Sequence, residues 1–280
     1  MGLPLEHAYD FTDQQFQKLR DLVYLESGIA LADIKKELVY GRLFRRIRSL
    51  KLNGFDDYLA LLEHHPQQEM GDFINAITTN LTGFFREEHH FDYLQEHILS
   101  WLYEQHRLDR RIRIWSAGCS TGEEPYSIVM SLLESIPDPQ NWDIKILATD
   151  IDSQVLSHAS EAVYDRERVE KLDAMRQRRW FVEGKQDKEG KVIVKDELRR
   201  LVSFEKLNLV QGWGMKNQFD VVFCRNVVIY FDKTTQSTLF ERFAGSIRQE
   251  GFLIIGHSET LFNVSDKFQL IGKTIYRKAS

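Results

Sequence analysis

The chain has 280 residues, 42% of them hydrophobic and 28% charged, an ordinary balance for a globular protein of one large or two modest domains. The net charge of −5 gives no overall case for nucleic-acid binding, and no apolar run approaches a membrane span. The start of the chain lacks the pattern of a signal peptide, and Cys119 and Cys224 are expected to be reduced thiols of a cytoplasmic protein.

The N-terminal part, residues 1–90, is predicted to be an all-helical domain. Thr12 and Gln15 form a capping-box pattern, apolar residues then recur at helical spacing, and Gly28 follows as a stop signal. Further helical stretches are expected over 32–52, 58–62 and 70–81.

The second predicted helix carries a basic face. Arg42, Arg45 and Arg46 are spaced at i, i+3 and i+4, so they share one side of the helix. Such a face is often only solvated, but on an acidic protein it would also suit an acidic helical substrate. The helix offers only Tyr40 and Phe44 as aromatic side chains, which is poor support for stacking on nucleic-acid bases.

From about residue 110 the pattern alternates strands with helices, which predicts a doubly wound, mostly parallel sheet over the domain 91–280. The expected strands are 111–117, 144–149, 201–206, 219–224, 251–256 and 268–277. The last follows its predecessor after a short loop, so it is expected to be antiparallel. A hairpin inserted at about 178–196 surrounds a polar, glycine-bounded loop and is either a decorated loop or a docking edge.

A glycine-rich turn, WSAGCSTGEEPYS, links the first of these strands to a helix. Gly118 and Gly122 do not have the spacing of the dinucleotide fingerprint. Glu123 and Glu124 stand where a phosphate would rest on the helix N-terminus. Two carboxylates would repel a phosphate and would suit a cationic nucleoside such as S-adenosylmethionine, although they would also complement the helix dipole.

Polar side chains end two further strands. Asp150 is placed to accept hydrogen bonds from ribose hydroxyls, whereas Asp152 is expected to cap the next helix. After a later buried strand, Arg225, Asn226 and Tyr230 are expected at the crevice where ligands bind in open α/β sheets.

Two other segments are less decisive. TTNLTGFFRE, at 78–87, either lines a cleft between domains or is a capped helix end. The pairs His64-His65 and Glu87-Glu88-His89-His90 lack the spacing of known metal sites, so no metal is expected and both are predicted to be solvated helix ends.

The segments WSAGCSTGEEPYS, TTNLTGFFRE, FCRNVVIYFDKTTQ and GFLIIGHSE together closely resemble the bacterial chemotaxis-receptor glutamate methyltransferases (CheR), a class I family dependent on S-adenosylmethionine. The resemblance covers the whole chain in order. It implies transfer of a methyl group to glutamates on the cytoplasmic helices of transmembrane receptors, with S-adenosylhomocysteine as product, for sensory adaptation. It also implies a cytoplasmic monomer that neither inserts into the membrane nor binds nucleic acid.

The resemblance assigns cofactor contacts beside Gly118 of the turn, namely Asn80, Thr82, Arg86, Glu124, Asp150, Asn208, Leu209, Arg225 and Asn226. Arg86 would orient the acceptor carboxylate and Tyr230 would fix its angle. A glutamate-bearing substrate favours docking on Arg42, Arg45 and Arg46, and a receptor C-terminal peptide would bind the hairpin. The hairpin loop 185–189 has no glycine, unlike the tethering members. Two alternatives are a sensor of S-adenosylmethionine without turnover and a methyltransferase acting on nucleic acid.

Overall fold

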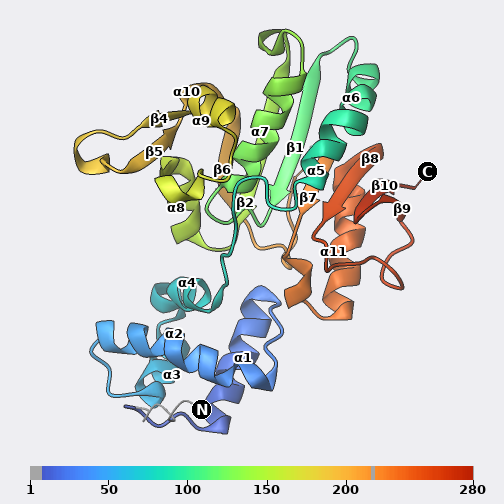
Figure 1. Cartoon of the computed structure of the whole chain (residues 1–280). Coiled ribbons are helices and arrows are strands. Elements are labelled where there is room, and N and C mark those ends of the chain that lie inside the picture. Colours follow the sequence, from blue (N-terminus) through green and yellow to red (C-terminus); the bar gives the residue numbers. More distant parts are fainter. Residues whose placement is uncertain (1–7, 216–217, 280) are drawn as a thin grey trace, which may run out of the picture. The chain divides into compact units, whose positions relative to one another are not determined.

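The computed structural model describes residues 8–215 and 218–279. The chain forms two compact units, Met1–Thr79 with Tyr230–Asp232, and Asn80–Ile229 with Lys233–Ser280 (Figure 1). Residues 80–90, which the sequence analysis placed in the N-terminal domain, therefore lie in the second unit. No helix in the described part of the chain is both long and apolar enough to cross a membrane.

The first unit is helical. Its helices are α1 (Asp13–Ser27), α2 (Lys36–Ser49), α3 (Phe55–His64) and α4 (Pro66–Ile77). The predicted capping box is confirmed, because the Gln15 amide donates to Thr12 Oγ1 and the Thr12 amide donates to Gln15 Oε1. Gly28 ends α1 with φ 72°, in the left-handed region that favours glycine.

Two of the predicted helices have other bounds than expected. The helix predicted over 32–52 begins with a 3₁₀ turn at Asp33–Lys35 and is α-helical only over Lys36–Ser49. The helix predicted over 70–81 begins earlier, at Pro66, and ends at Ile77, because Thr78 adopts an extended conformation. The guanidinium of Arg42 donates to the carbonyls of Ile77 and Thr78, so it caps the last turn of α4.

The second unit is built on a seven-stranded sheet of order β6-β2-β1-β7-β8-β10-β9. Its strands are β1 (Arg111–Ala117), β2 (Asp143–Asp150), β6 (Val202–Lys206), β7 (Phe219–Cys224), β8 (Ile247–Ile255), β9 (Phe268–Gly272) and β10 (Ile275–Lys278). The first five in this list run parallel, as predicted. The order reverses at β1, which has β2 on one side and β7 on the other, and such a reversal opens a crevice at the carboxyl ends of the strands.

The last predicted strand, 268–277, is wrong in one respect. It is two strands, because the chain reverses at Lys273-Thr274, where Thr274 has φ 56°. β10 pairs antiparallel with β8, as expected of a short connection, and β9 pairs with β10 at the sheet edge.

Helices α7 (Glu123–Ser135), α8 (Ser153–Glu161) and α11 (Lys233–Ser246) connect the strands, and α5 (His89–Tyr93) and α6 (Leu99–Gln105) precede β1 (Figure 1). The main core lies between these helices and the sheet. Ile112, Ile114 and Val221, on β1 and β7, are fully buried in it. Burial of this kind is the main source of stability and fixes the positions of the strand ends.

The insertion contains the predicted hairpin, β4 (Phe181–Glu183) and β5 (Lys191–Val194), which projects in Figure 1. The sequence analysis missed a third strand, β3 (Val163–Asp165), which pairs with β5 and leaves β4 at an edge. Helices α9 (Ala174–Trp180) and α10 (Asp196–Arg199) complete the insertion. Arg176 and Trp180 of α9 anchor it to α7, since both donate to the carboxylate of Glu134.

Candidate active site

The glycine-rich turn between β1 and α7 is a tight cradle. Gly118 has φ 87° and Gly122 has φ 94°. A Cβ atom on Gly118 would lie 2.4 Å from Val227 Cγ2, and one on Gly122 would lie 2.8 Å from Ala159 Cβ. The amide of Gly118 donates to the Thr149 carbonyl over 2.8 Å, which fastens the turn to the end of β2. Both positions therefore require glycine for conformation and for space.

Asp150, the last residue of β2, holds the glycine-rich turn by a hydrogen bond to its backbone. The exposed fraction of Asp150 is 9%. Its carboxylate accepts the Ser120 amide at 2.8 Å and the Asp152 amide at 3.0 Å, and burial raises its pKa. Asp152 caps α8, as predicted, by accepting the Gln154 amide at 2.8 Å, and it also accepts Asn80 Nδ2 at 2.8 Å. The carboxylate of Asp150 keeps further lone pairs for a ligand, so its ribose contact stays a prediction.

The two glutamates at the start of α7 are buried, with exposed fractions of 0% for Glu123 and 8% for Glu124. Glu123 accepts the Thr121 hydroxyl at 2.6 Å and lies 3.7 Å from Arg168 Nη1. One Glu123 oxygen has no hydrogen-bond partner among the described residues. Because both side chains are buried and make contacts inside the protein, they do more than complement a helix dipole from the surface.

Arg225, at the end of β7, is enclosed by the protein. Its Nη1 donates to Glu124 over 2.9 Å. Its Nη2 donates to the backbone carbonyl of Arg86 and lies 3.4 Å from the Glu87 carboxylate, while the guanidinium lies 5.5 Å from the Phe91 ring centroid. The sequence analysis placed Glu124 and Arg225 at one site, and the structure brings them together as a buried ion pair.

Glu87 is the centre of this network, which the sequence analysis missed. Its side chain is 10% exposed and lies close to Arg225. It accepts hydrogen bonds from His257 Nδ1 at 2.7 Å, the His257 amide at 3.1 Å and Asn226 Nδ2 at 3.1 Å. Burial opposes ionisation of Glu87, but the bond from His257, the charge of Arg225 and the bond from Asn226 outweigh it and lower its pKa to about 2.

The prediction that Glu87-Glu88-His89-His90 is a solvated helix end is therefore wrong for two of the four residues. His90 is fully buried, its Nε2 lies 2.9 Å from Thr274 Oγ1, and burial together with the charge of Arg225 lowers its pKa to about 3. Spacing along the chain could not reveal this, because the partners come from the distant end of the sequence. His64 and His65, by contrast, are exposed at the end of α3, as predicted.

Asn226 sits in a strained conformation that a second buried carboxylate supports. Its φ is 58°, and its amide donates to Glu259 Oε2 over 3.0 Å. Glu259 also accepts the amides of Gly256 at 2.5 Å and Ile229 at 3.2 Å, and burial raises its pKa. Glu259 lies in the segment GFLIIGHSE, whose residue spacing alone does not indicate this role.

The remaining predicted cofactor residues, Thr82, Arg86, Asn208 and Leu209, belong to the second unit. The Thr82 carbonyl accepts Arg168 Nη1 at 2.9 Å, and Arg86 Nη1 donates to the Leu81 carbonyl over 2.7 Å. Asn208 and Leu209 follow β6, where the preceding amide, of Leu207, donates to the Asp150 carbonyl. Tyr230 belongs to the first unit, where its carbonyl accepts the Ala30 amide at 2.8 Å.

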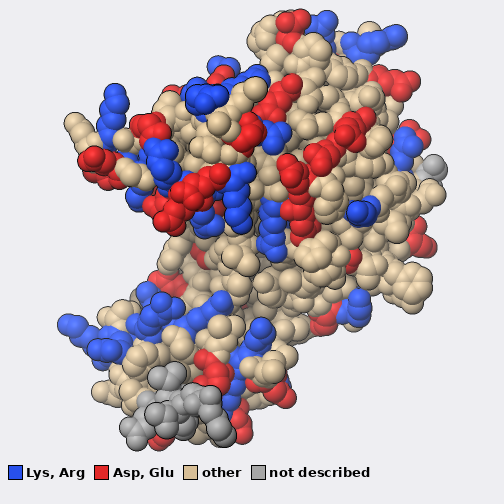
Figure 2. All heavy atoms as spheres, viewed as in Figure 1, with Lys and Arg blue, Asp and Glu red and all other residues tan. Residues whose placement is uncertain are grey.

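The basic face of α2 is partly neutralised within the first unit. Figure 2 shows Lys and Arg side chains gathered where Figure 1 draws α2. Arg46 forms a bidentate pair with Glu69 of α4, at 2.8 and 2.6 Å, and also pairs with Asp72. Arg42 caps α4, as described above. Of the three predicted docking arginines, Arg45 is the exposed one and forms no ion pair with the described residues.

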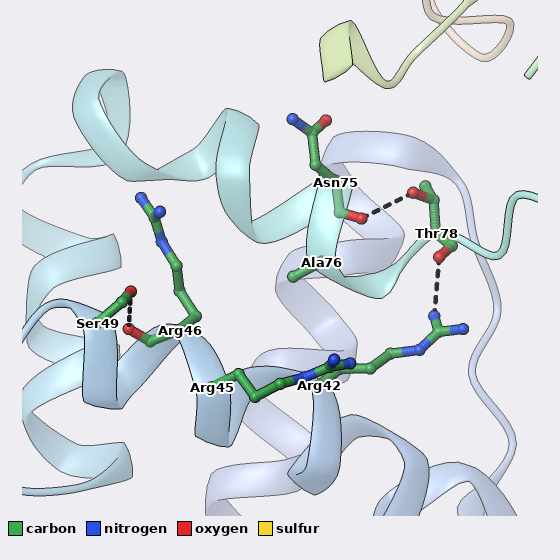
Figure 3. Close-up of a pocket in the computed structure, with 7 residues that line it drawn as sticks. All are labelled: Arg42, Arg45, Arg46, Ser49, Asn75, Ala76 and Thr78. Atoms are coloured by element: carbon green, nitrogen blue, oxygen red, sulfur yellow. Dashed lines mark hydrogen bonds between the residues drawn. The ribbon is translucent and has the colours of Figure 1, made fainter. Parts of the chain in front are cut away.

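These arginines line one side of an open pocket of about 490 Å³ in the first unit (Figure 3). Ser49, Asn75, Ala76 and Thr78 complete the lining. The Glu69 carboxylate raises the pKa of Arg46, whereas burial lowers that of Arg42. Arg42 and Arg46 thus make hydrogen bonds within their own domain, and docking on the three arginines stays a prediction.

Two family models match the chain in order. Residues 14–78 match the all-alpha domain of CheR methyltransferase, and residues 80–277 match its S-adenosylmethionine-binding domain. The chain is 43% identical over 274 residues to chemotaxis protein methyltransferase 2 of Pseudomonas aeruginosa, covering 97% of this chain and 95% of the relative. It is 42% identical over 277 residues to the chemotaxis protein methyltransferase of Escherichia coli, covering 98% and 94%.

Proposed function

The chain belongs to the CheR methyltransferase family, and we propose that the carboxyl ends of β1, β2, β6 and β7 form the site at which it methylates chemotaxis receptors. It is an S-adenosylmethionine-dependent enzyme that forms methyl esters on receptor glutamates. One observation carries the placement: Asp150 is the last residue of β2, Gly118 directly follows β1 and Arg225 directly follows β7, and these three strands are parallel neighbours. Parallel strands end at one edge of a sheet, so these residues converge there.

The residues at this edge fit S-adenosylmethionine. Gly118 and Gly122 let the turn pack directly against Val227 and Ala159, where a Cβ atom would clash, so the backbone of the turn is held in a fixed position at this edge. Asp150 would accept the ribose hydroxyls. The turn 115–127 carries two glutamates and no lysine or arginine, and the neighbouring Arg225 is already paired with Glu124, so the turn suits a cationic nucleoside better than a phosphate. Asn80, Thr82, Asn208, Leu209 and Asn226 would complete the contacts.

When bound, S-adenosylmethionine supplies an electrophilic methyl group on a sulfonium. The acceptor glutamate, with an ordinary pKa of about 4.3, is ionised near neutral pH and needs no general base. The protein therefore has to exclude water and orient the carboxylate in line with the methyl group. Transfer removes one positive and one negative charge, so a site of low dielectric favours it.

Arg86 and Tyr230 are proposed to orient the acceptor. Arg86 spends one Nη1 donor on the Leu81 carbonyl, and a guanidinium has five N–H donors, so others remain for a carboxylate. The same role for Tyr230 rests on the family resemblance alone. Replacing Arg86 by Ala should slow methylation more than it weakens binding of S-adenosylhomocysteine, because its contact is to the acceptor.

Receptor docking is proposed to rest on Arg45 more than on its neighbours. An acidic receptor helix could pair directly with the exposed guanidinium of Arg45. Arg42 and Arg46 would add positive charge, but their guanidinium groups are held by hydrogen bonds within the first unit. The edge strand β4, where Val182 is 46% exposed, is a second proposed contact, since an edge can add a peptide strand by backbone hydrogen bonds. Such tethering raises local substrate concentration and leaves the chemistry unchanged.

The test is transfer of label from tritiated S-adenosylmethionine to the cytoplasmic domain of a receptor, followed by mild base. We expect label on the receptor that base releases as methanol, since esters hydrolyse and N-methyl groups do not. Binding of S-adenosylmethionine without transfer would instead support a sensor. Label on nucleic acid in a parallel reaction would support the other alternative.

A further inference from the structure

Four hydrogen-bond donors from three residues converge on the two oxygens of Glu87. Oε1 faces His257 Nδ1 at 2.7 Å and Asn226 Nδ2 at 3.1 Å. Oε2 faces the His257 amide at 3.1 Å and Arg225 Nη2 at 3.4 Å. The backbone of Glu87 has φ 57°, which is unusual for a residue other than glycine. Such a backbone conformation costs free energy, so it is retained only where contacts with the surrounding structure hold it in place.

The bond to Glu87 decides which way the Asn226 amide points. The NH₂ end is used by Glu87, so the carbonyl end of the amide is left as an acceptor for other groups. Behind it the space is full, because a Cβ atom on Gly256 would lie 2.4 Å from Asn226 Nδ2. Glu259 holds the Asn226 backbone at the same time. The side chain thus has its orientation set by contacts on both sides.

We propose that Glu87 is a positioning residue for methyl transfer, which fixes the Asn226 amide and the Arg225 guanidinium at the carboxyl end of β7. The inference rests on the proposed placement of the active site at these strand ends. His257 supports Glu87 from the surface, since its side chain is 67% exposed and donates to the carboxylate. Glu87 acts through its neighbours and has no assigned contact with either substrate.

Replacement of Glu87 by Gln isolates this role. The two side chains have nearly the same shape. The carboxylate of glutamate has two acceptor oxygens, whereas the amide of glutamine has one acceptor oxygen and one NH₂ donor. Whichever way the amide turns, two donors face its NH₂ group: either His257 Nδ1 with Asn226 Nδ2, or the His257 amide with Arg225. Asn226 or Arg225 then has to move.

The experiment compares Glu87→Gln with Glu88→Gln, a matched change at the exposed next residue. Calorimetry with S-adenosylhomocysteine gives the number of binding sites in each preparation. The kcat and KM of receptor methylation are then measured, with kcat expressed per S-adenosylhomocysteine-binding site. We expect kcat to fall at least about tenfold for Glu87→Gln, within the ~10²-fold that a 1 Å misplacement can cost, and less than twofold for Glu88→Gln. A role in folding alone would reduce the number of sites and leave kcat per site unchanged.

The result that overturns the inference is a kcat per site for Glu87→Gln within twofold of the wild type, or an equal fall in both variants. If Glu87→Gln does not fold, His257→Ala and His257→Asn decide. An asparagine keeps an N–H near the position of His257 Nδ1, so it should restore part of the rate that alanine loses, whereas wild-type rates for His257→Ala overturn the inference. Absence of methylation by the wild type would instead refute the proposed site and activity.

Discussion

The pair between Arg46 and Glu69 allows a quantitative prediction for the first unit. Glu69 is 3% exposed and accepts Arg46 Nε at 2.8 Å, Arg46 Nη2 at 2.6 Å and the Tyr58 hydroxyl at 2.8 Å. Replacing Arg46 by Ala leaves a buried carboxylate with one donor in place of three. Breaking a buried pair typically costs about 3–5 kcal/mol. Arg46 is 28% exposed, so water can enter, and we expect about 2–3 kcal/mol.

The assay uses the distribution of tryptophan in the chain. All 5 tryptophans lie in the second unit, whereas the first unit is helical. Urea unfolding followed by far-UV circular dichroism therefore reports both units, and tryptophan fluorescence reports the second. We expect the dichroism midpoint of Arg46→Ala to fall well below that of the wild type. Arg45→Ala, which removes an exposed arginine of the same helix, is the control and should change the midpoint little.

Equal midpoints for Arg46→Ala and Arg45→Ala would refute the reasoning, because they would mean that water compensates Glu69 fully. A fluorescence transition that shifts as far as the dichroism transition would show that the two units unfold together. In that case the free energy still falls by the same amount, but it is shared by the whole chain.

Three further outcomes are expected. Asp150→Ala should weaken binding of S-adenosylhomocysteine by roughly 1–3 kcal/mol, the cost of unpaired ribose hydroxyls, and unchanged affinity by calorimetry would remove Asp150 from the site. Arg45→Glu should slow receptor methylation at low salt, with cofactor affinity intact and with a smaller effect at high salt; a wild-type rate at low salt would contradict docking. The folded chain lowers the pKa of His90 from 6.5 to about 3 and of Glu87 from 4.5 to about 2, so the unfolded chain binds more protons between these values. The free energy of unfolding should therefore fall as the pH drops through these windows, by on the order of 3 kcal/mol for Glu87, and His90→Gln should flatten the part above pH 4.5 in a urea series.

The sequence was sufficient for most local structure. The Thr12 capping box, the strand at 111–117 and the glycine-rich turn with Gly118 are all written in residues a few positions apart, where periodicity and capping act directly. The sequence also indicated that Asp150 and Arg225 lie at the same edge of the sheet, because parallel strands all end at one edge.

Three features of the sites depended on tertiary structure. Arg46 reads as one of three equivalent surface cations until α4 places Glu69 beside it. Glu87 reads as a polar helix end until the loop after β8 brings His257, 170 residues later, onto its carboxylate. The predicted strand 268–277 breaks where the chain must turn back to pair with β8.

The physical reason is the range over which each effect acts. Helical and strand periodicity record which face of an element is apolar, and that information lies within the element. An ion pair or a buried hydrogen bond depends on which distant segment packs against that face, and its strength depends on how completely the packing excludes water. The sequence of this chain therefore determined its helices and strands, the glycine-rich turn and the polar residues at the strand ends. The partners of Arg46, Glu87 and Asn226 depended on the tertiary structure, which brings distant segments together.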